Sequence, residues 1–206
     1  MSTTRSYGDA CGIARALDVV GERWALLVVR ELLLGPQRFS DLRRALARAS
    51  SNIVADRLRE LEARGVVARR TLPPPAASSV YELTARGREL EPIVLALGGW
   101  GIDAPHPPGP ETLSATSVLL FLRGSVRPAG DAVYRVELDE RVWTVRAAGG
   151  EVHVEPGEPP EPDAILRTDA VTLNALLEDA SGLDAAIARG DVVASGDMSA
   201  LRGLIR

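Results

Sequence analysis

The sequence is poor in the side chains on which most enzyme and metal sites depend. Its 206 residues include one cysteine, Cys11, and two histidines, His106 and His153. A single cysteine excludes an intramolecular disulfide and any zinc or iron–sulfur site built from several cysteines. So few histidines argue against a histidine-rich metal site or a Cys–His nucleophile. We expect no metal, no cofactor and no enzymatic activity, and we expect both histidines to lie on the surface.

Long hydrophobic runs are absent as well. No apolar run approaches the roughly 20 residues that span a bilayer, and residues 1–8 are polar, without the apolar core of a signal peptide. A content of 46% hydrophobic and 25% charged residues is typical of a soluble globular protein with one large or two small domains. The sequence therefore predicts a cytoplasmic protein without a membrane partner.

Lysine is missing too, so all 24 basic residues are arginine, and they are unevenly placed. Residues 1–104 hold 15 arginines against 12 acidic residues, whereas residues 105–206 hold 9 against 16. Between residues 23 and 70 there are 11 arginines against 5 acidic residues, a local charge of +6. This concentration favours a surface for a polyanion such as DNA. The alternative is a solvated helical surface without a partner.

A proline-rich stretch divides the chain. Residues 104–110 contain four prolines in seven positions, which excludes a helix interior or a central strand. We predict a stiff linker at residues 105–112, between a domain of residues 1–104 and a second domain of residues 113–206.

The first domain shows the apolar spacing of helices followed by a hairpin. Helices are predicted at 10–20, with a stripe of Ala10, Ile13, Ala14 and Leu17, at 24–34, at 40–47 with Ser40 as N-cap, and from 50 or 51 to 65. Val54, Leu58 and Leu61 of the fourth helix should face the core. Strands at 66–70 and 80–84 flank a proline-rich loop, and a last helix at 85–101 should kink at Pro92.

In the second domain, the apolar residues alternate with polar ones, as they do in strands. Tyr134, Val136 and Leu138 alternate with charged residues, and Gly149-Gly150 marks a hairpin turn. Further along we predict a strand at 164–167, a helix from about 170 capped by Asp169, a helix that ends at Gly190, a strand at 191–194, and a terminal helix from Met198 with Leu201, Leu204 and Ile205 on one side. This order favours an α+β fold.

Three helices, an amphipathic fourth helix and a two-stranded hairpin are the arrangement of a winged helix-turn-helix, whose common use is DNA binding. The same part of the chain contains, in this order, Cys11, Gly21-Glu22-Arg23-Trp24, Arg30-Glu31-Leu32, Gly35-Pro36-Gln37-Arg38-Phe39-Ser40-Asp41-Leu42, Leu58-Arg59-Glu60-Leu61-Glu62, Gly65, Tyr81-Glu82-Leu83-Thr84, Gly87 and Trp100-Gly101. With these motifs, residues 8–103 closely resemble the HxlR-type transcriptional regulators. The resemblance implies a bacterial transcription factor that forms a homodimer through its first and last helices.

The candidate DNA-binding residues lie on both sides of the helix-turn-helix. We expect phosphate contacts from arginines around the third helix, groove contacts from the start of the fourth helix, and wing contacts after it. These residues are Arg38, Arg43, Arg44, Arg48, Ser51, Asn52, Ala55, Asp56, Arg57, Arg59, Arg69 and Arg70. Asn52 could bond adenine, Ala55 could touch a thymine methyl group, and Asp56 could accept from cytosine N4. Helical salt bridges with Glu60 and Glu62 are the alternative for Arg57, Arg59 and Arg64.

Asn52 and Asp56 depart from the family pattern at these places. The family's operator is therefore not carried over. Cys11 lies near the start of the first helix, where some members have a thiol that senses oxidants or electrophiles, and a helix N-terminus lowers a thiol pKa. Gly12 follows it where the family commonly has proline. The alternative role for Cys11 is that of a small buried apolar side chain.

Near its end the second domain contains the motif Gly190-Asp191-Val192-Val193-Ala194-Ser195-Gly196-Asp197. This motif is the best match in a resemblance, over about residues 113–206, to sterol-carrier-protein-like lipid-binding domains. The resemblance implies an α+β domain with an apolar tunnel. The candidate wall residues are Tyr134, Val136, Leu138, Leu173, Leu176, Leu177, Leu201 and Leu204. A closed core without space for a ligand is the alternative.

We therefore expect a homodimeric transcriptional repressor that binds double-stranded DNA through its first domain and a hydrophobic small molecule through its second. The second hypothesis is a lipid or acyl carrier that uses residues 1–104 only to dimerise. An enzyme built on residues 113–206 comes third.

Overall fold

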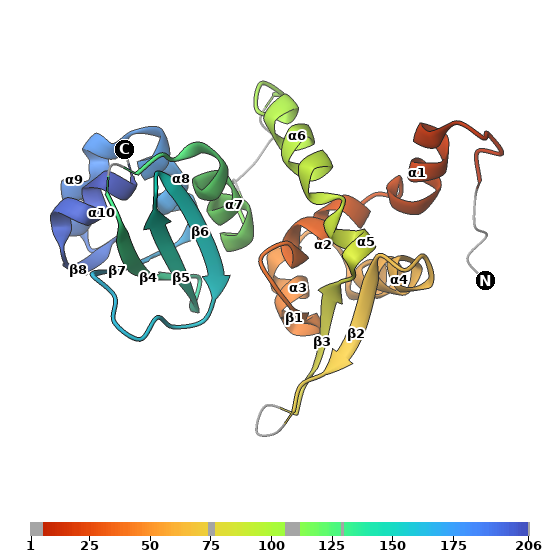
Figure 1. The fold of residues 1–206 in the computed structure, drawn as a ribbon, viewed down its shortest axis with the longest axis horizontal. Helices are drawn as coiled ribbons and strands as arrows, with labels where there is room; N and C mark the ends of the chain where they lie inside the picture. The colour runs from red at the N-terminus through yellow and green to blue at the C-terminus, as the bar shows by residue number, and fades with distance from the viewer. Residues whose placement is uncertain (1–5, 74–76, 106–111, 129, 206) are drawn as a thin grey trace. The chain divides into compact units, whose positions relative to one another are not determined.

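The computed structural model describes residues 6–73, 77–105, 112–128 and 130–205 (Figure 1). The chain divides into two compact units, residues 1–106 and 107–206, which are described separately. Most of the predicted linker, with His106, lies outside the described residues, and so does the tip of the predicted hairpin at residues 74–76.

The first unit consists of helices and a small antiparallel sheet. The elements are α1 (Gly12–Val20), α2 (Ala25–Leu32), β1 (Gln37–Arg38), α3 (Phe39–Ala45), α4 (Ser51–Ala63), β2 (Val67–Thr71), β3 (Ser79–Leu83), α5 (Ala85–Arg88) and α6 (Glu91–Gly101). The strands lie in the order β1-β3-β2. Helices followed by a hairpin confirm the predicted winged helix-turn-helix.

The core of this unit lies where α2, α3 and α4 meet. Leu42, Val54, Leu58 and Leu61 are at most 1% exposed, together with Val28 of α2. The spacing of the three apolar residues of α4 at i, i+4 and i+7 places them on one face, which confirms the predicted core face of this helix.

The start of α3 differs from the prediction. We expected Ser40 as the N-cap, but α3 begins at Phe39, and the Arg38 N–H donates to the Asp41 carboxylate at 3.3 Å. An acid three residues into the helix satisfies the amide before the first turn, so the helix begins earlier. Residues Gln37 and Arg38 just before it form the unpredicted strand β1, which pairs with β3.

The last predicted helix of the first unit is two helices. Helix α5 ends at Arg88 and α6 begins at Glu91, with a turn at Glu89 and Leu90 between them and Pro92 in the first turn of α6. Proline lacks only an N–H that the first turn does not need, so Pro92 begins a helix rather than kinking one. The first helix also begins later than expected, because α1 starts at Gly12 and leaves Ala10 outside it.

The second unit is a sheet covered on one face by helices (Figure 1). The elements are α7 (Ala115–Ser125), β4 (Ala132–Leu138), β5 (Arg141–Ala148), β6 (Glu151–Pro156), β7 (Ala164–Thr168), α8 (Ala170–Glu178), the 3-10 turn η1 (Ala180–Gly182), α9 (Leu183–Arg189), β8 (Val193–Gly196) and α10 (Met198–Leu204). The strands lie in the order β6-β5-β4-β7-β8, and β4 and β7 run parallel. This architecture confirms the predicted α+β fold.

Alternation along β4 separates the two faces of this sheet. Tyr134, Val136 and Leu138 are at most 2% exposed and face the helices, whereas Arg135 and Glu137 lie on the other face. Gly149 and Gly150 turn the β5–β6 hairpin with φ of 58° and 79°, as predicted. Asp169 caps α8 by accepting from the Thr172 N–H at 2.8 Å, also as predicted. Strand β8 begins two residues later than expected, and α7 had no predicted counterpart.

Candidate nucleic-acid interface

Two short helices and a tight turn position the candidate interface. The Ser50 hydroxyl accepts from the Ile53 N–H at 3.3 Å, so Ser50 caps α4 at its first turn. On the α3 side of the turn, the Arg43 guanidinium donates to the Ala49 carbonyl at 2.7 Å. These bonds hold α4 at a fixed angle behind α3, which is the geometry that lets a second helix enter a groove.

The face of α4 opposite the core is polar. Ser51 and Asn52 are exposed at its start, Ala55 and Asp56 are half-buried one turn later, and Arg59 is exposed after them. Arg59 forms an ion pair with the Asp56 carboxylate, and its Nε donates to the Ala55 carbonyl at 3.4 Å. The structure therefore brings these predicted groove residues together on one surface.

Arg57 lies apart from that surface. Its side chain is only 15% exposed, and its Nη1 lies 2.6 Å from Glu60 Oε2 and 3.4 Å from Glu22 Oε2. The structure therefore agrees with the alternative of a salt bridge for Arg57. Its guanidinium also links α4 to the segment between α1 and α2. Glu22 was not predicted as a partner of Arg57, because no local spacing in the sequence relates the two residues.

The arginines predicted to contact phosphate differ in their exposure to solvent. Arg44 and Arg48 are exposed around the end of α3, whereas Arg43 is half-buried and donates to the helix-turn-helix backbone. Arg38 is exposed, and its Nε donates to the Ser78 hydroxyl at 3.1 Å. Arg43 thus fastens the turn, and Arg38 joins the start of α3 to the wing.

The wing holds its two arginines by side-chain contacts that sequence reasoning missed. Arg69 Nε donates to the Ser79 hydroxyl at 2.6 Å, and the guanidinium lies 5.9 Å from the centre of the Tyr81 ring. Arg70 pairs with Glu82 at 3.1 Å. The pairing of β2 with β3 places Arg69 directly opposite Tyr81, whereas Ser79 and Glu82 lie two positions along β3 from the residues opposite Arg69 and Arg70. The hairpin spacing was the only sequence signal that could have indicated them.

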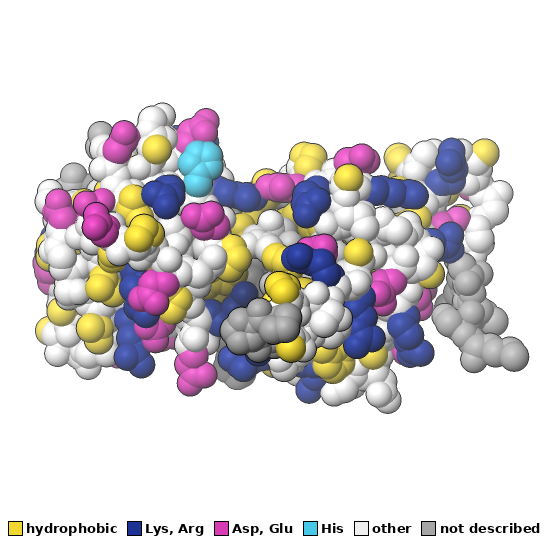
Figure 2. All heavy atoms as spheres, turned by 60° about the horizontal axis from the view of Figure 1, so that its bottom comes forward, with side chains coloured by type: hydrophobic (Ala, Val, Ile, Leu, Met, Phe, Trp, Pro, Cys, Tyr) yellow, Lys and Arg dark blue, Asp and Glu magenta, His cyan; other side chains and the backbone are white. Residues whose placement is uncertain are grey.

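In the space-filling view of Figure 2, arginine side chains are spread over the surface of the winged-helix unit, and acidic side chains lie among them. The local excess of arginine in residues 23–70 is partly neutralised by ion pairs with acidic side chains. Arg57 and Arg59 are the clearest examples, because each pairs with an acid on α4 itself.

A second surface of this unit is apolar. Helix α6 has no buried residue, and Trp100 and Ile93 are 80% and 55% exposed. Ile13 and Leu17 of α1 are exposed as well. A hollow of about 580 Å³ lies between α1 and the start of α6, and charged residues such as Arg15, Asp18 and Arg86 line it together with Val19, Leu90 and Ile93. Exposed apolar residues on two neighbouring helices are typical of a surface covered by another chain.

Cys11 lies at the N-cap of α1 and is exposed. The alternative role of a buried apolar side chain is therefore wrong for this protomer. The backbone amides of Ala14 and Ile13 lower the pKa of the Cys11 thiol, since a helix N-terminus favours the thiolate. The geometry supplies an accessible thiol with enhanced acidity.

The predicted ligand walls of the second unit form a packed core. Of the eight residues, Leu177 is half-buried and the others are at most 4% exposed. Tyr134 also lines a hollow of about 280 Å³ beside α10, together with Ala132, Asp197 and Ser199. The Tyr134 hydroxyl donates to the Ala200 carbonyl at 2.9 Å. Burial raises the pKa of this hydroxyl, and the carboxylates of Asp163 and Asp197 raise it further.

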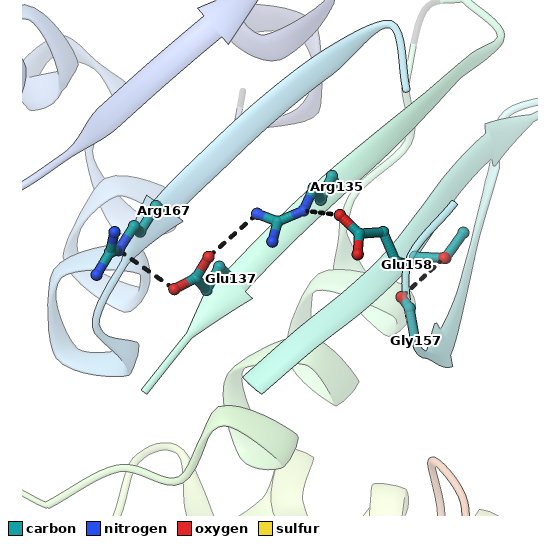
Figure 3. Close-up of polar contacts among 6 residues, drawn as sticks. Arg135, Glu137, Gly157, Glu158 and Arg167 are labelled. Carbon is teal, nitrogen blue, oxygen red and sulfur yellow. Dashed lines mark hydrogen bonds and ion pairs between the residues drawn. The ribbon is translucent and has the colours of Figure 1, made fainter. Parts of the chain in front are cut away.

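The outer face of the same sheet carries a connected row of charges (Figure 3). Arg135 donates to Glu158 at 2.7 Å and to Glu137 at 3.1 Å, and Glu137 lies 3.2 Å from Arg167. The Thr144 hydroxyl donates to the Gly157 carbonyl at 3.0 Å. These contacts fasten the segment after β6 across the outer face and satisfy the charges there.

Within the described part of the chain, no group of three or more His, Cys, Asp or Glu side chains could hold a metal ion. The same residues include no helix long and apolar enough to cross a membrane.

Comparison with known proteins separates the same two units. Residues 19–107 match the model of the HxlR-like helix-turn-helix family, and residues 122–205 match that of the SCP-2 sterol transfer family. The uncharacterized HTH-type transcriptional regulator YvaP of Bacillus subtilis is 38% identical over 89 residues, which are 43% of this chain and 82% of YvaP. The regulator sll1512 of Synechocystis is 38% identical over 96 residues, 47% of this chain and 71% of sll1512.

Among solved structures, the redox regulator HypR in its oxidized form aligns with a TM-score of 0.44 and 34% identity, over 47% of this chain and all of HypR. The relatives and the family models agree on the first unit. The chain belongs to the HxlR-like helix-turn-helix family of transcriptional regulators, and its second unit is an SCP-2-type domain.

Proposed function

We propose that the chain is a homodimeric transcriptional repressor that inserts α4 into the major groove of DNA and is not an enzyme. The polar face of α4 is the observation that carries this proposal, because Ser51, Asn52 and Arg59 are exposed on a helix whose opposite face is fully buried. Hydrogen-bonding side chains at the start of such a helix are those that read base edges. The arginines at Arg44 and Arg48 supply phosphate contacts beside it.

The proposed dimer interface consists of α1 and α6. Its support is the exposed apolar surface of these helices, which no element of the first unit covers among the described residues. Dimerisation would place two copies of α4 on one side of DNA, with half-sites about one helical turn, roughly 10–11 bp, apart. Sedimentation of the full chain at micromolar concentration tests this part.

The second unit is proposed to bind a hydrophobic small molecule at the hollow between Tyr134 of the sheet and α10, next to its packed core. The support is its similarity to the SCP-2 sterol transfer family and the hollow beside Tyr134. A ligand that binds only the folded state raises the melting temperature with its concentration. We would screen fatty acids, acyl esters and sterols by thermal shift and extract the purified protein for mass spectrometry. No shift and no extractable lipid would contradict this part alone.

The experiment that tests DNA binding is selection of bound fragments from random and genomic DNA, followed by a gel shift at physiological salt. A regulator enriches a defined sequence and retains it over non-specific competitor. The second candidate function, a lipid or acyl carrier that uses its first unit only to dimerise, predicts bound lipid and no enriched sequence.

A further inference from the structure

Asp56 is an acid on the face of α4 that we place against DNA, where it would be repelled by phosphate and by the acceptor-rich edge of guanine. It is 45% exposed and forms an ion pair with Arg59, three residues later on the same helix. The pair has no net charge, so Asp56 does not oppose the approach of this surface to DNA.

The contacts of Arg59 define the direction of its side chain. Its Nη2 bonds Asp56 Oδ1, and its Nε donates to the Ala55 carbonyl at 3.4 Å. Both partners precede Arg59, so the guanidinium lies back along the helix towards its N-terminus. The N-terminal residues of such a helix are those that meet base edges. Asn52, Asp56 and Arg59 also follow one another at i, i+4 and i+7, which places them on a single face.

We propose that Asp56 and Arg59 act as one reading unit, in which Arg59 recognises a guanine and Asp56 positions its guanidinium. Arginine binds guanine O6 and N7 with two N–H donors, the most frequent specific contact in the major groove. A guanidinium has five N–H donors in a rigid fork, so bonding Asp56 and Ala55 leaves others for a base. The inference rests on the proposed DNA binding. It also replaces the direct cytosine contact that Asp56 could otherwise make.

The two interpretations of Asp56 make different predictions for variants of the full chain. If Asp56 positions Arg59, then Asp56→Ala and Arg59→Ala lose preference for guanine at the same base pair, each by roughly tenfold. The double variant is then no worse than Arg59→Ala alone, because the two residues act through one contact. If Asp56 reads cytosine directly, the two losses fall at different base pairs and add.

The measurement is competition binding with the selected DNA site, substituted one base pair at a time, for the wild type and each variant. Arg59→Lys keeps the charge but not the two-donor geometry, so it should lose the guanine preference and keep its affinity for non-specific DNA. Glu62→Gln is the matched control, since it removes a carboxylate from α4 that forms no ion pair with Arg59 in the described residues. Its profile should equal that of the wild type.

Folding is separated from recognition by the melting temperature. An exposed pair contributes little to stability, so Asp56→Ala should melt within about 2 °C of the wild type. Losses at different base pairs, or a guanine preference unchanged by Asp56→Ala, would overturn the reading unit while leaving DNA binding intact. A wild-type chain that enriches no DNA sequence would overturn the proposed function and the reading unit together.

Discussion

At the residue scale, Gly87 is a position where only glycine fits. A Cβ there would lie 2.1 Å from the Val66 carbonyl oxygen, because α5 is drawn against the start of β2 by Thr84, whose hydroxyl donates to the Gly65 carbonyl at 2.7 Å. We expect Gly87→Ala to lower the free energy of unfolding of the first unit by about 2 kcal/mol or more. Chemical denaturation measures this free energy, and hydrogen exchange on peptides from each unit shows which of the two units has been destabilised.

Gly124 is the matched control for that substitution. It lies in α7, and a Cβ there meets no atom within 4 Å. Alanine is better than glycine inside a helix, so Gly124→Ala should stabilise the second unit by roughly 0.5–1 kcal/mol. Equal effects of the two substitutions would contradict the close contact assigned to Gly87.

Cys11 provides a prediction about pH at the same scale. The amides at the start of α1 lower the pKa of its thiol, and the thiolate is the form that reacts. As pH rises, Cys11 should therefore reach half of its maximal alkylation rate at a lower pH than a free cysteine thiol does. The lowered pKa also means that the folded state binds its proton less tightly, so the thiolate's contribution to stability is lost as pH falls through the folded pKa.

The rate of reaction with iodoacetamide, followed by mass spectrometry from pH 5 to 10, measures this. The urea-unfolded chain is the reference, because its thiol lacks the helix. A folded profile that coincides with the unfolded one would show that α1 does not activate Cys11.

At the scale of elements, the exposed apolar surface of α6 leads to a prediction about the proposed dimer. Leu97 is 47% exposed in the protomer, so a charge there should leave the protomer folded but become buried in a dimer built on this helix. We expect Leu97→Glu to convert the chain to a monomer and to weaken DNA binding at least tenfold, since the two half-sites would be bound separately.

Analytical ultracentrifugation with circular dichroism distinguishes loss of the dimer from loss of folding. Ala188→Glu, an exposed position on α9, is the control and should leave the assembly unchanged. A folded dimer of Leu97→Glu would exclude α6 from the interface.

The helices and strands also show how much of the fold could be predicted from the sequence. Periodicity predicted α4 and β4 because each buries one face and leaves the other polar. It missed α7, since the apolar residues of this helix occur nearly all round and define no single face. Strand β1 has two residues and exists only through pairing with β3, some 40 positions later, and no local pattern indicates such a partner. The tie between Glu22 and Arg57 was hidden for the same reason.

At the scale of the whole molecule, the charge is divided between the units. Residues 105–206 have 9 arginines against 16 acidic residues, a net charge of −7 in the same chain as the unit proposed to bind DNA. This charge should repel DNA at low salt and be screened above about 0.3 M, where the Debye length falls to several ångströms. A fragment of residues 1–105 should therefore bind non-specific DNA several-fold more tightly than the full chain at low salt, with no difference at high salt.

Fluorescence anisotropy over a salt series, with the oligomeric state of the fragment checked at each point, measures this difference. An equal affinity of fragment and full chain at 50 mM salt would show that the acidic unit stays beyond electrostatic reach of the bound DNA.

The parallel pairing of β4 with β7 has a consequence for the order in which the second unit folds during synthesis. Strands β4, β5 and β6 are joined by tight hairpins and can pair as they leave the ribosome. The parallel pairing of β4 with β7, by contrast, cannot form until Ala164, the residue of β7 next to Tyr134, has been made 30 residues later. The Tyr134 hydroxyl then waits for the Ala200 carbonyl of α10. Until β7 has been made, one edge of β4 is unpaired and apolar. The nascent unit is therefore most prone to misassembly after the synthesis of β6 and before that of β7.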